Sequence, residues 1–268
     1  MSTNSKSAKS TKKSKTSLKD ESDLNFGFDK VSAKRKRSLV DTVFSNVAGK
    51  YDLMNDLMSF GVHRLWKDKF CSMIPNLNSN ILDVAGGTGD IVFRIHERAK
   101  KQSSYPHIVV CDINRQMLKI CKDKSVDKNI LKGLDLIVGD AENLPFADNS
   151  FDYYTIAFGI RNMLSIENTL KEAYRVLKPT GKFLCLEFSR VQNEMMKPLY
   201  DFYSFNVIPT IGKCITGNES AYLYLAESIN IFPDQEDFKT KIQDVGFQDV
   251  NYDNLTFGVA AIHYGYKI

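Results

Sequence analysis

From Ile81 onward, short apolar runs rich in β-branched residues alternate with segments whose apolar positions recur at helical spacing. Each apolar run is nearly continuous, which is typical of strands in a sheet covered on both faces. The runs that predict strands are ILDVA (81–85), HIVVCDI (107–113), LDLIVGD (134–140), FDYYTIAF (151–158) and GKFLCLEF (181–188). The predicted helices between them are Asp90–Lys100, Gln116–Lys124 and Ile166–Leu177. This alternation predicts an α/β fold with a doubly wound, mostly parallel sheet.

The C-terminal segment has a different pattern. A helical stretch at 235–245 is followed by two strand-like runs at 247–255 and 258–268, which predict an antiparallel hairpin that brings the sheet to seven strands. Residues 39–75 predict a helical N-terminal cover. Residues 191–232 are rich in Tyr, Phe and Met without β alternation, and they predict a mostly helical insertion on the substrate side of the sheet.

The basic excess of the chain is concentrated at its N-terminus. Residues 1–40 contain eleven Lys and Arg against four Asp and Glu, whereas the formal charge of the whole chain is +4. We therefore expect a disordered basic tail at 1–25 and a single domain at 26–268. A basic segment confined to a tail argues against a nucleic-acid-binding core. Attraction to anionic lipid is a weaker interpretation, and a mitochondrial address is disfavoured because the tail is Lys-rich.

No apolar run is long enough to span a bilayer. The five cysteines are an odd number without C-x-x-C spacing, which indicates neither a disulfide framework nor a zinc site. A reducing compartment and no bound metal are expected. Composition alone is that of an ordinary globular enzyme.

Three acidic or glycine-rich segments follow successive predicted strands. A glycine-rich turn in LDVAGGTGD (82–90) separates the first strand from the first helix, and Asp112 and Asp140 end the next two strands. Open α/β sheets bind ligands beyond the carboxyl ends of their strands, where these residues would meet. Glycines let a backbone approach a ligand closely, and a strand-end acid can accept hydrogen bonds from ribose hydroxyls. The pattern predicts a nucleoside pocket rather than unrelated surface acids.

The glycine turn departs from the dinucleotide fingerprint G-x-G-x-x-G, because Gly87-Thr88-Gly89 is followed by Asp90-Ile91-Val92. Asp90 at the helix N-terminus would face a pyrophosphate with like charge. S-adenosylmethionine (AdoMet) has a ribose and an adenine but no phosphate, and its sulfonium cation suits an acidic pocket. The sequence thus favours AdoMet over a nicotinamide dinucleotide.

These motifs resemble those of the class I AdoMet-dependent methyltransferases, and within them the ubiquinone/menaquinone biosynthesis C-methyltransferases. The resemblance runs from about Phe26 to Ile268. Its specific marks are VFSNVAGKYDLMNDLMSFGVHRLWK (43–67), LDVAGGTGD (82–90), DAENLPFADNSFD (140–152), FGIRN (158–162), YRVLKPTGKFLCLEFS (174–189) and YLAESINIFPDQ (224–235). A generic methyltransferase would share only the glycine turn and the strand-end acids. The family resemblance implies a Rossmann-like fold with AdoMet as the cofactor.

The resemblance also implies which residues bind the cofactor. They are the glycine-turn residues Gly87, Thr88 and Gly89, the ribose-binding Asp112, and the pair Asp140 and Ala141 beside the adenine. One position departs from the family, because Ala157 occupies a place that often carries Ser. We therefore expect no side-chain hydrogen bond to AdoMet from this position, whereas a backbone contact there stays open.

The implied reaction methylates a ring carbon of a polyprenylated benzoquinol or of demethylmenaquinol. Carbon is a poor nucleophile, so the ring must first gain electron density, most simply by losing a hydroxyl proton. Ionising a phenol of pKa ~10 at neutral pH costs ~4 kcal/mol of free energy. The predicted catalytic residues are Arg161, which would stabilise the oxyanion, Asn162, which would position the second oxygen, and Tyr51 in the helical cover. The alternative for Arg161 is a salt bridge to Glu187 or Asp152 that only braces the sheet.

The expected partners are a lipid-tailed quinol, a membrane surface contacted peripherally, and a homodimer or quinone-synthesis complex, with no nucleic acid. The expected location is a bacterial cytoplasm beside the inner membrane, with the mitochondrial matrix as the alternative. Two other functions fit less well. One is methylation of a different hydroxyaromatic or lipid, and the other is a non-catalytic role in a membrane-associated assembly.

Overall fold

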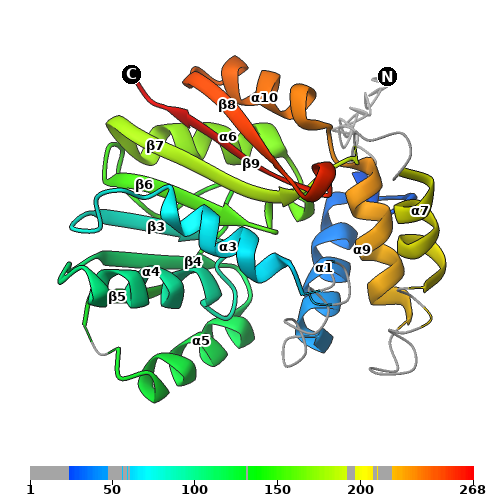
Figure 1. Ribbon diagram of the computed structural model, residues 1–268. Helices are drawn as coiled ribbons and strands as arrows, with labels where there is room; N and C mark the ends of the chain where they lie inside the picture. The colour runs from blue at the N-terminus through cyan, green and yellow to red at the C-terminus, as the bar shows by residue number, and fades with distance from the viewer. Residues whose placement is uncertain are drawn as a thin grey trace, which may run out of the picture.

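A seven-stranded sheet with strand order β5-β4-β3-β6-β7-β9-β8 forms the centre of the molecule (Figure 1). The structure is a computed structural model, and it describes residues 24–47, 56, 59, 61–130, 132–191, 197–207, 210 and 219–268. The strands are β3 (Asn80–Val84), β4 (His107–Asp112), β5 (Leu134–Val138), β6 (Phe151–Ala157), β7 (Leu177–Phe188), β8 (Gln248–Leu255) and β9 (Ala260–Tyr266). The predicted doubly wound sheet is confirmed.

The chain order of the strands reverses beside β3. The sheet grows from β3 to β4 and β5 on one side, and then continues with β6 and β7 on the other, with all these neighbours parallel. β9 pairs antiparallel with both β7 and β8, which confirms the predicted C-terminal hairpin. Reversal of strand order opens a crevice at the carboxyl ends of β3, β4 and β6, where such sheets bind their ligands.

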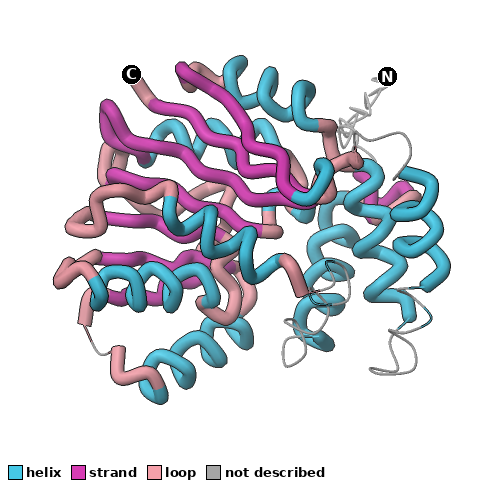
Figure 2. The backbone as a smooth tube through the Cα atoms, in the orientation of Figure 1, coloured by secondary structure: helices cyan, strands magenta, loops and turns pink. Residues whose placement is uncertain are grey.

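Helices cover both faces of the sheet, as the near-continuous apolar strands require (Figure 2). One core packs α3 (His63–Ser72), α4 (Asp90–Lys101) and α5 (Arg115–Asp127) on one face, and the other core packs α6 (Ile166–Val176) and α10 (Gln235–Asp244) on the opposite face. α5 is longer than the predicted 116–124. α6 ends at Val176 and β7 begins directly at Leu177, so the strand is longer than the predicted 181–188.

A group of helices lies beyond the carboxyl end of the sheet. α1 (Ala33–Val47), α7 (Lys197–Phe202) and α9 (Glu219–Ile231) lie side by side there, with the π-helical turn η3 (Tyr203–Val207) next to α7 (Figure 1). α1 begins at Ala33, earlier than the predicted 39. A two-stranded hairpin of β1 (Leu24–Phe26) and β2 (Asp29–Val31) precedes α1 and was not predicted. Among the described residues, no helix is long and apolar enough to cross a membrane.

Candidate active site

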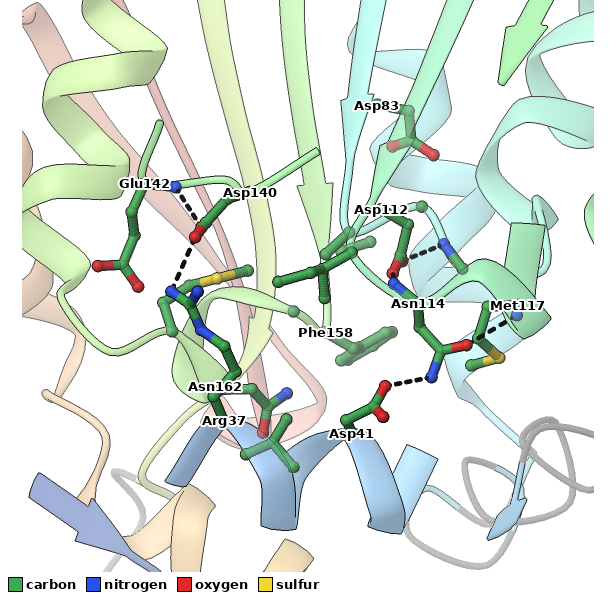
Figure 3. Close-up of a pocket in the computed structure, with 18 of the residues that line it drawn as sticks. Arg37, Asp41, Asp83, Asp112, Asn114, Met117, Asp140, Glu142, Phe158 and Asn162 are labelled. Atoms are coloured by element: carbon green, nitrogen blue, oxygen red, sulfur yellow. Dashed lines mark hydrogen bonds and ion pairs between the residues drawn. The ribbon is translucent and has the colours of Figure 1, made fainter. Parts of the chain in front are cut away.

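A cavity of about 770 Å³ lies between the sheet and the helices at its carboxyl end (Figure 3). Pockets of this size hold small-molecule ligands and cofactors. Its lining comes from the β3–α4 turn, from the ends of β4 and β6, from the loop after β5, from η2 (Ile160–Asn162) and from α1. α1 thus covers part of the predicted crevice, on the side opposite the sheet.

The glycine-rich turn brings two of its three predicted residues to the cavity. Gly87 and Thr88 line it, whereas Gly89 does not. Gly89 has a φ of +85°, and a Cβ there would lie 2.5 Å from the Sγ of Cys121, so this glycine lets α4 start close to α5. Lys124 donates a hydrogen bond to the Thr88 hydroxyl over 3.3 Å. Gly89 therefore shapes the turn, and Gly87 and Thr88 are the residues that can contact a ligand.

Asp112 ends β4 with its carboxylate at the cavity wall. Its Oδ2 accepts a hydrogen bond from the Gly87 backbone N–H at 2.9 Å, and its Oδ1 accepts one from Asn114 N–H at 2.8 Å. Each oxygen keeps a further lone pair, so the carboxylate can still accept bonds from two ribose hydroxyls. Burial raises the pKa of Asp112, and the two backbone N–H groups oppose that rise. The geometry fits the predicted ribose-binding role.

Asp140 lines the cavity after β5, but Ala141 is buried beneath it and does not. The Oδ1 of Asp140 accepts a hydrogen bond from Glu142 N–H at 3.0 Å, and its Oδ2 pairs with Arg37 of α1 at 2.8 Å. An adenine at this wall would therefore meet a carboxylate already engaged by α1. Arg37 was not among the predicted site residues, because nothing in its local sequence shows that α1 crosses the pocket.

Asp83 in β3 is a cavity residue that sequence reasoning missed. Its Oδ1 accepts a hydrogen bond from the Thr155 hydroxyl at 2.7 Å. Its Oδ2 finds no hydrogen-bond partner in the part of the chain that the structure describes. Burial raises the pKa of this carboxyl to about 7. A buried carboxylate oxygen without a partner is costly, so a ligand cation in the cavity would stabilise it.

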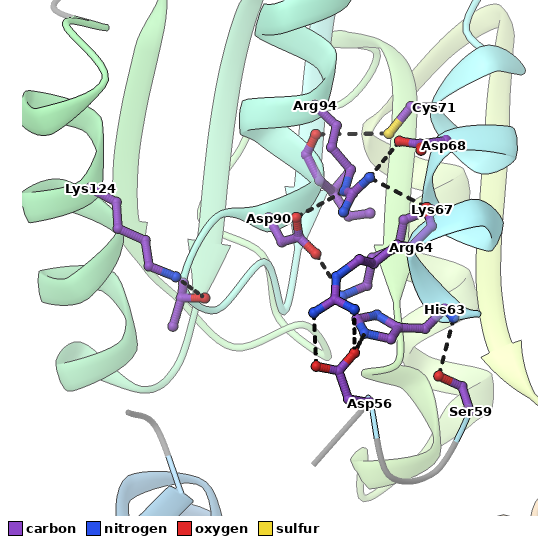
Figure 4. Close-up of polar contacts among 12 residues, drawn as sticks. Asp56, Ser59, His63, Arg64, Lys67, Asp68, Cys71, Asp90, Arg94 and Lys124 are labelled. Atoms are coloured by element: carbon purple, nitrogen blue, oxygen red, sulfur yellow. Dashed lines mark hydrogen bonds and ion pairs between the residues drawn. The ribbon is translucent and has the colours of Figure 1, made fainter. Parts of the chain in front are cut away.

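Asp90 at the start of α4 is neutralised by two cations (Figure 4). Lys67, with a side chain only 3% exposed, lies 2.6 Å from its Oδ2, and Arg94 lies 2.9 Å from its Oδ1. Although burial raises the pKa of Asp90, the charges of Lys67 and Arg94 hold it below its ordinary value. The predicted like-charge conflict with a phosphate is thus weaker than the sequence indicated, because the pairing cations come from elsewhere in the chain. The absent third glycine remains as the argument against a dinucleotide.

α1 is fastened over the cavity through side chains on successive turns. The buried Lys36 donates to the Met163 carbonyl at 2.7 Å, and Asp41 accepts a hydrogen bond from the Asn114 amide at 2.9 Å. The same amide also donates to Ser45 at 2.9 Å, and its oxygen caps the N-terminus of α5. Burial lowers the pKa of Lys36. α1 is therefore tied to both ends of the cofactor rim.

Arg161 does not line the cavity. Its Nη1 lies 2.5 Å from Oε1 of Glu187 and donates to the Phe158 carbonyl at 2.8 Å, and both charged side chains are buried. Of the two partners considered from sequence, Glu187 is the observed one, while Asp152 pairs with Lys178. Burial raises the pKa of Glu187, and the Arg161 charge opposes the rise. A direct contact between Arg161 and a substrate oxygen remains a prediction, and it would have to coexist with this ion pair.

Asn162 lines the cavity together with Met163 and Leu164. Ala157 and Phe158 line the cavity at the end of β6. The position at which this chain departs from the family, Ala157, therefore does lie on the cavity rim. The structure thus brings together Gly87, Thr88, Asp112, Asp140 and Asn162. Gly89, Ala141 and Arg161 are not among the residues that line the cavity.

The predicted catalytic residue Tyr51 lies outside the described residues. Two other polar residues of the same segment are described. His63 is 1% exposed, with its Nε2 2.9 Å from Oδ1 of Asp56, and Asp56 also pairs with Arg64 (Figure 4). Neither His63 nor Asp56 lines the cavity. Burial is the main reason that the pKa of His63 is lowered.

Solved structures of AdoMet-dependent methyltransferases share this fold. A SAM-dependent methyltransferase of Thermotoga maritima has a TM-score of 0.56 and 19% identity, covering 85% of this chain and 99% of that chain. Phosphoethanolamine N-methyltransferase 2 of Haemonchus contortus, solved with S-adenosylhomocysteine, has a TM-score of 0.55 and 15% identity over 76% of this chain and 52% of that chain. At such low identity these likenesses establish the Rossmann-like fold alone.

Relatives of high sequence identity show which family of methyltransferases the chain belongs to. The ubiquinone/menaquinone biosynthesis C-methyltransferase UbiE of Rickettsia bellii (strain OSU 85-389) is 60% identical over 244 residues, which are 91% of this chain and 98% of the relative. The UbiE protein of Rickettsia prowazekii (strain Madrid E) is 57% identical over the same length. The model of the ubiE/COQ5 methyltransferase family matches residues 30–267. With its fold, its cofactor-sized cavity and this nearly complete match, the chain belongs to the ubiE/COQ5 methyltransferase family.

Proposed function

We propose that this protein transfers the methyl group of AdoMet to a ring carbon of a polyprenylated quinol. The observation that carries the proposal is the two-sided cavity. One side presents Asp112 with the glycine turn, and the other presents Asp140 and the Asn162 amide beside the apolar Met163 and Leu164 (Figure 3). Such a cavity can hold a polar, cationic nucleoside against an aromatic ring that carries oxygens.

The residues present fit AdoMet. Asp112 retains acceptor capacity on both oxygens. Asp83 also lines the cavity, and a ligand cation there would stabilise its carboxylate, whose Oδ2 has no hydrogen-bond partner among the described residues. Thr88 and Gly87 supply a hydroxyl and a close backbone approach. When bound, AdoMet would supply an electrophilic methyl group on a sulfonium: the S–CH3 bond would break as the ring carbon bonds to the methyl group, S-adenosylhomocysteine would leave, and the proton of that carbon would pass to solvent. All other tasks fall to the residues of this chain.

The first task is to raise the electron density of the acceptor ring. A neutral phenol is a weak carbon nucleophile, and ionising it at neutral pH costs ~4 kcal/mol. A hydrogen bond from the Asn162 amide to the ring oxygen would stabilise the developing oxyanion. The second task is orientation, because a methyl transfer requires the ring carbon to lie in line with the methyl group. Met163 and Leu164 supply an apolar surface against which the ring can lie.

Arg161 enters the proposal as the residue that anchors η2. Its guanidinium joins the Phe158 carbonyl and the Glu187 carboxylate directly behind Asn162. This ion pair fixes the backbone from which the Asn162 side chain projects. The direct oxyanion contact expected from the sequence is the competing role, and double substitution of the pair separates the two.

The reaction is tested with purified protein, AdoMet with an isotopically labelled methyl group, and short-tailed analogues of 2-methoxy-6-polyprenyl-1,4-benzoquinol and demethylmenaquinol. Mass spectrometry detects the product, and NMR distinguishes C-methylation from O-methylation. We expect label on a ring carbon of at least one quinol. Label on oxygen, or no label in either quinol with AdoMet bound, would contradict the proposal. The relative rates identify the preferred acceptor.

We further propose that the protein works at a membrane surface, on the cytoplasmic side of a bacterial inner membrane. A polyprenyl tail keeps the substrate in the bilayer, and the relatives named above are bacterial. Phe28 and Phe202 are 59% and 60% exposed, and Phe28 stacks against Phe205 with ring centroids 6.2 Å apart. In the sequence, Phe28 comes shortly after the basic segment 1–25. Exposed aromatic and basic groups together favour an anionic lipid surface.

Flotation with anionic liposomes tests membrane contact. Binding should fall at high salt, on deletion of residues 1–25, and on replacement of Phe28 and Phe202 by Ser. Tyr105 is 85% exposed and precedes β4, at the opposite end of the sheet, so Tyr105→Ser is the matched control. Absence of salt-sensitive binding with and without residues 1–25 would reject the membrane proposal while leaving the reaction intact.

A further inference from the structure

Asn162 is held by a tyrosine that is distant in the sequence. The hydroxyl of Tyr224, in α9, donates a hydrogen bond to Oδ1 of Asn162 at 2.9 Å. Tyr224 is 5% exposed, and its burial raises its pKa to about 12, so the hydroxyl stays protonated at neutral pH. Among the described residues, no acceptor meets the Nδ2 of Asn162. The one amide oxygen is therefore engaged, and both N–H groups are left for the cavity.

The aromatic ring of Tyr224 is also fixed by stacking against a second ring. Phe26 of β1 stacks on it, with centroids 4.2 Å apart and planes inclined by 14°. The same hairpin is joined to α9 by a hydrogen bond from Phe28 N–H to Oε2 of Glu227 at 3.2 Å. A stacked, buried ring has few alternative rotamers, so its hydroxyl is a fixed point.

The backbone of Asn162 is fixed from the other side. Arg161 bonds to the Phe158 carbonyl and to Glu187, and Asn162 N–H bonds to the Gly159 carbonyl at 3.1 Å. Because these contacts fix the backbone of Asn162 and Tyr224 fixes its Oδ1, the direction in which Nδ2 points is also fixed. Figure 3 shows the labelled Asn162 at the cavity.

We propose that Tyr224 is a positioning residue for methyl transfer: its hydroxyl holds the Asn162 amide so that Nδ2 donates to an oxygen of the acceptor ring. This inference rests on the proposed quinol reaction. It assigns a task to the segment YLAESINIFPDQ (224–235), which begins with this tyrosine. An unheld amide could rotate by half a turn and present its oxygen, which repels an oxyanion.

The test compares Tyr224→Phe with Tyr222→Phe, which removes another buried tyrosine hydroxyl from the same helix. Tyr224→Phe should lower kcat with the short-tailed quinol by about tenfold, since a lost hydrogen bond is worth about one factor of ten. The AdoMet affinity and the melting temperature should match those of Tyr222→Phe. Equal turnover in the two variants would overturn the proposal.

Two further measurements exclude a merely structural role. In an Asn162→Ala background, Tyr224→Phe should cause no additional loss, whereas an undiminished loss would show that Tyr224 acts elsewhere and would reject the proposal. Asn162→Asp still accepts the bond from Tyr224 but cannot donate to the ring oxygen, so its turnover should fall below that of Tyr224→Phe.

NMR of the side-chain amide distinguishes failure of this inference from failure of the proposed reaction. The Asn162 Nδ2 resonances, identified by their loss in Asn162→Ala, should shift and broaden in Tyr224→Phe and stay in place in Tyr222→Phe. This readout needs no turnover. Unchanged resonances would refute the orienting hydrogen bond even if the enzyme methylates quinols, and shifted resonances in a protein inactive on quinols would reject only the reaction.

Discussion

Arg161 and Glu187 form a buried ion pair, with 2.5 Å between Nη1 and Oε1, immediately behind the cavity wall that Asn162 lines. The pair joins η2 to the end of β7, so the position of Asn162 depends on a charge interaction between residues that do not line the cavity. Buried pairs of this kind are sensitive to loss of one partner, because the remaining charge is left without compensation.

Arg161→Met should therefore destabilise the fold. It leaves the buried Glu187 carboxylate without its counter-charge, and removing one partner of a buried ion pair lowers the free energy of unfolding by about 3–5 kcal/mol. Urea unfolding measures the change. Lys171→Met, which breaks the exposed pair with Glu167, is the control and should leave stability nearly unchanged, because solvent screens an exposed pair. A stability of Arg161→Met close to that of the control would contradict the anchoring role.

The double variant Arg161→Met with Glu187→Gln separates anchoring from chemistry. Removing both charges should recover part of the lost stability, because no isolated buried carboxylate remains. We expect turnover to recover with stability, and AdoMet affinity to remain unchanged throughout. Recovered stability without recovered turnover would instead support the direct oxyanion contact predicted from the sequence.

Asp112→Ala should weaken AdoMet binding by about tenfold or more. The change removes the acceptor for the ribose and also frees the Gly87 and Asn114 N–H groups, and a charged hydrogen bond is worth about 1.5–3 kcal/mol. Isothermal titration with AdoMet and with NADH measures both affinities. Asp135→Ala, an exposed acid in β5 that pairs with His107, is the control. Preferred binding of NADH by the wild type would overturn the cofactor assignment.

Asp83 should make stability depend on pH. Its pKa is raised from 3.8 to about 7, so the folded state binds more protons than the unfolded state between those values. The free energy of unfolding should therefore fall as pH rises through this window, by an amount on the order of a few kcal/mol, and level off above about pH 7. Asp83→Asn should remove this slope. An identical slope in both proteins would show that another group is responsible.

The same carboxyl should couple AdoMet binding to proton release. A cation near the free Oδ2 favours the ionised form, so AdoMet affinity should rise roughly tenfold from about pH 6 to about pH 8. Titration in two buffers of different ionisation enthalpy measures the proton released. Asp83→Asn should flatten this dependence, whereas an unchanged dependence would place the titrating group elsewhere.

The fastening of α1 can be tested at Asn114. Asn114→Asp keeps the oxygen that caps α5 but replaces the amide donor with a charge facing Asp41. α1 should then open, with faster amide hydrogen exchange in α1 and faster AdoMet dissociation. Adding Asp41→Asn removes the repulsion and should restore both rates. Failure of this second change to restore them would indicate that Asn114 acts only through α5.

The alternation of strands and helices could be predicted from the sequence because each element depends on the local spacing of its apolar residues. Near-continuous apolar runs specify strands covered on both faces, and the turn residues that separate them specify where each strand ends. The convergence of Asp112, Asp140 and the glycine turn follows from the same pattern, since parallel strands deliver their carboxyl ends to one edge. The N-terminal hairpin and the start of α1 were missed because short polar elements have weak periodicity.

Which side chains face the cavity was decided only by the tertiary structure. Arg161 and Asn162 are adjacent in sequence, yet Glu187 draws the guanidinium inward while the amide turns outward, and a partner on another strand leaves no local signal. Lys67 neutralises Asp90, α1 covers the cofactor rim, and Tyr224 meets Asn162 across 62 residues. Local sequence therefore determined the sheet and its ligand-binding edge, whereas long-range charge pairing and burial determined the working surface of the site.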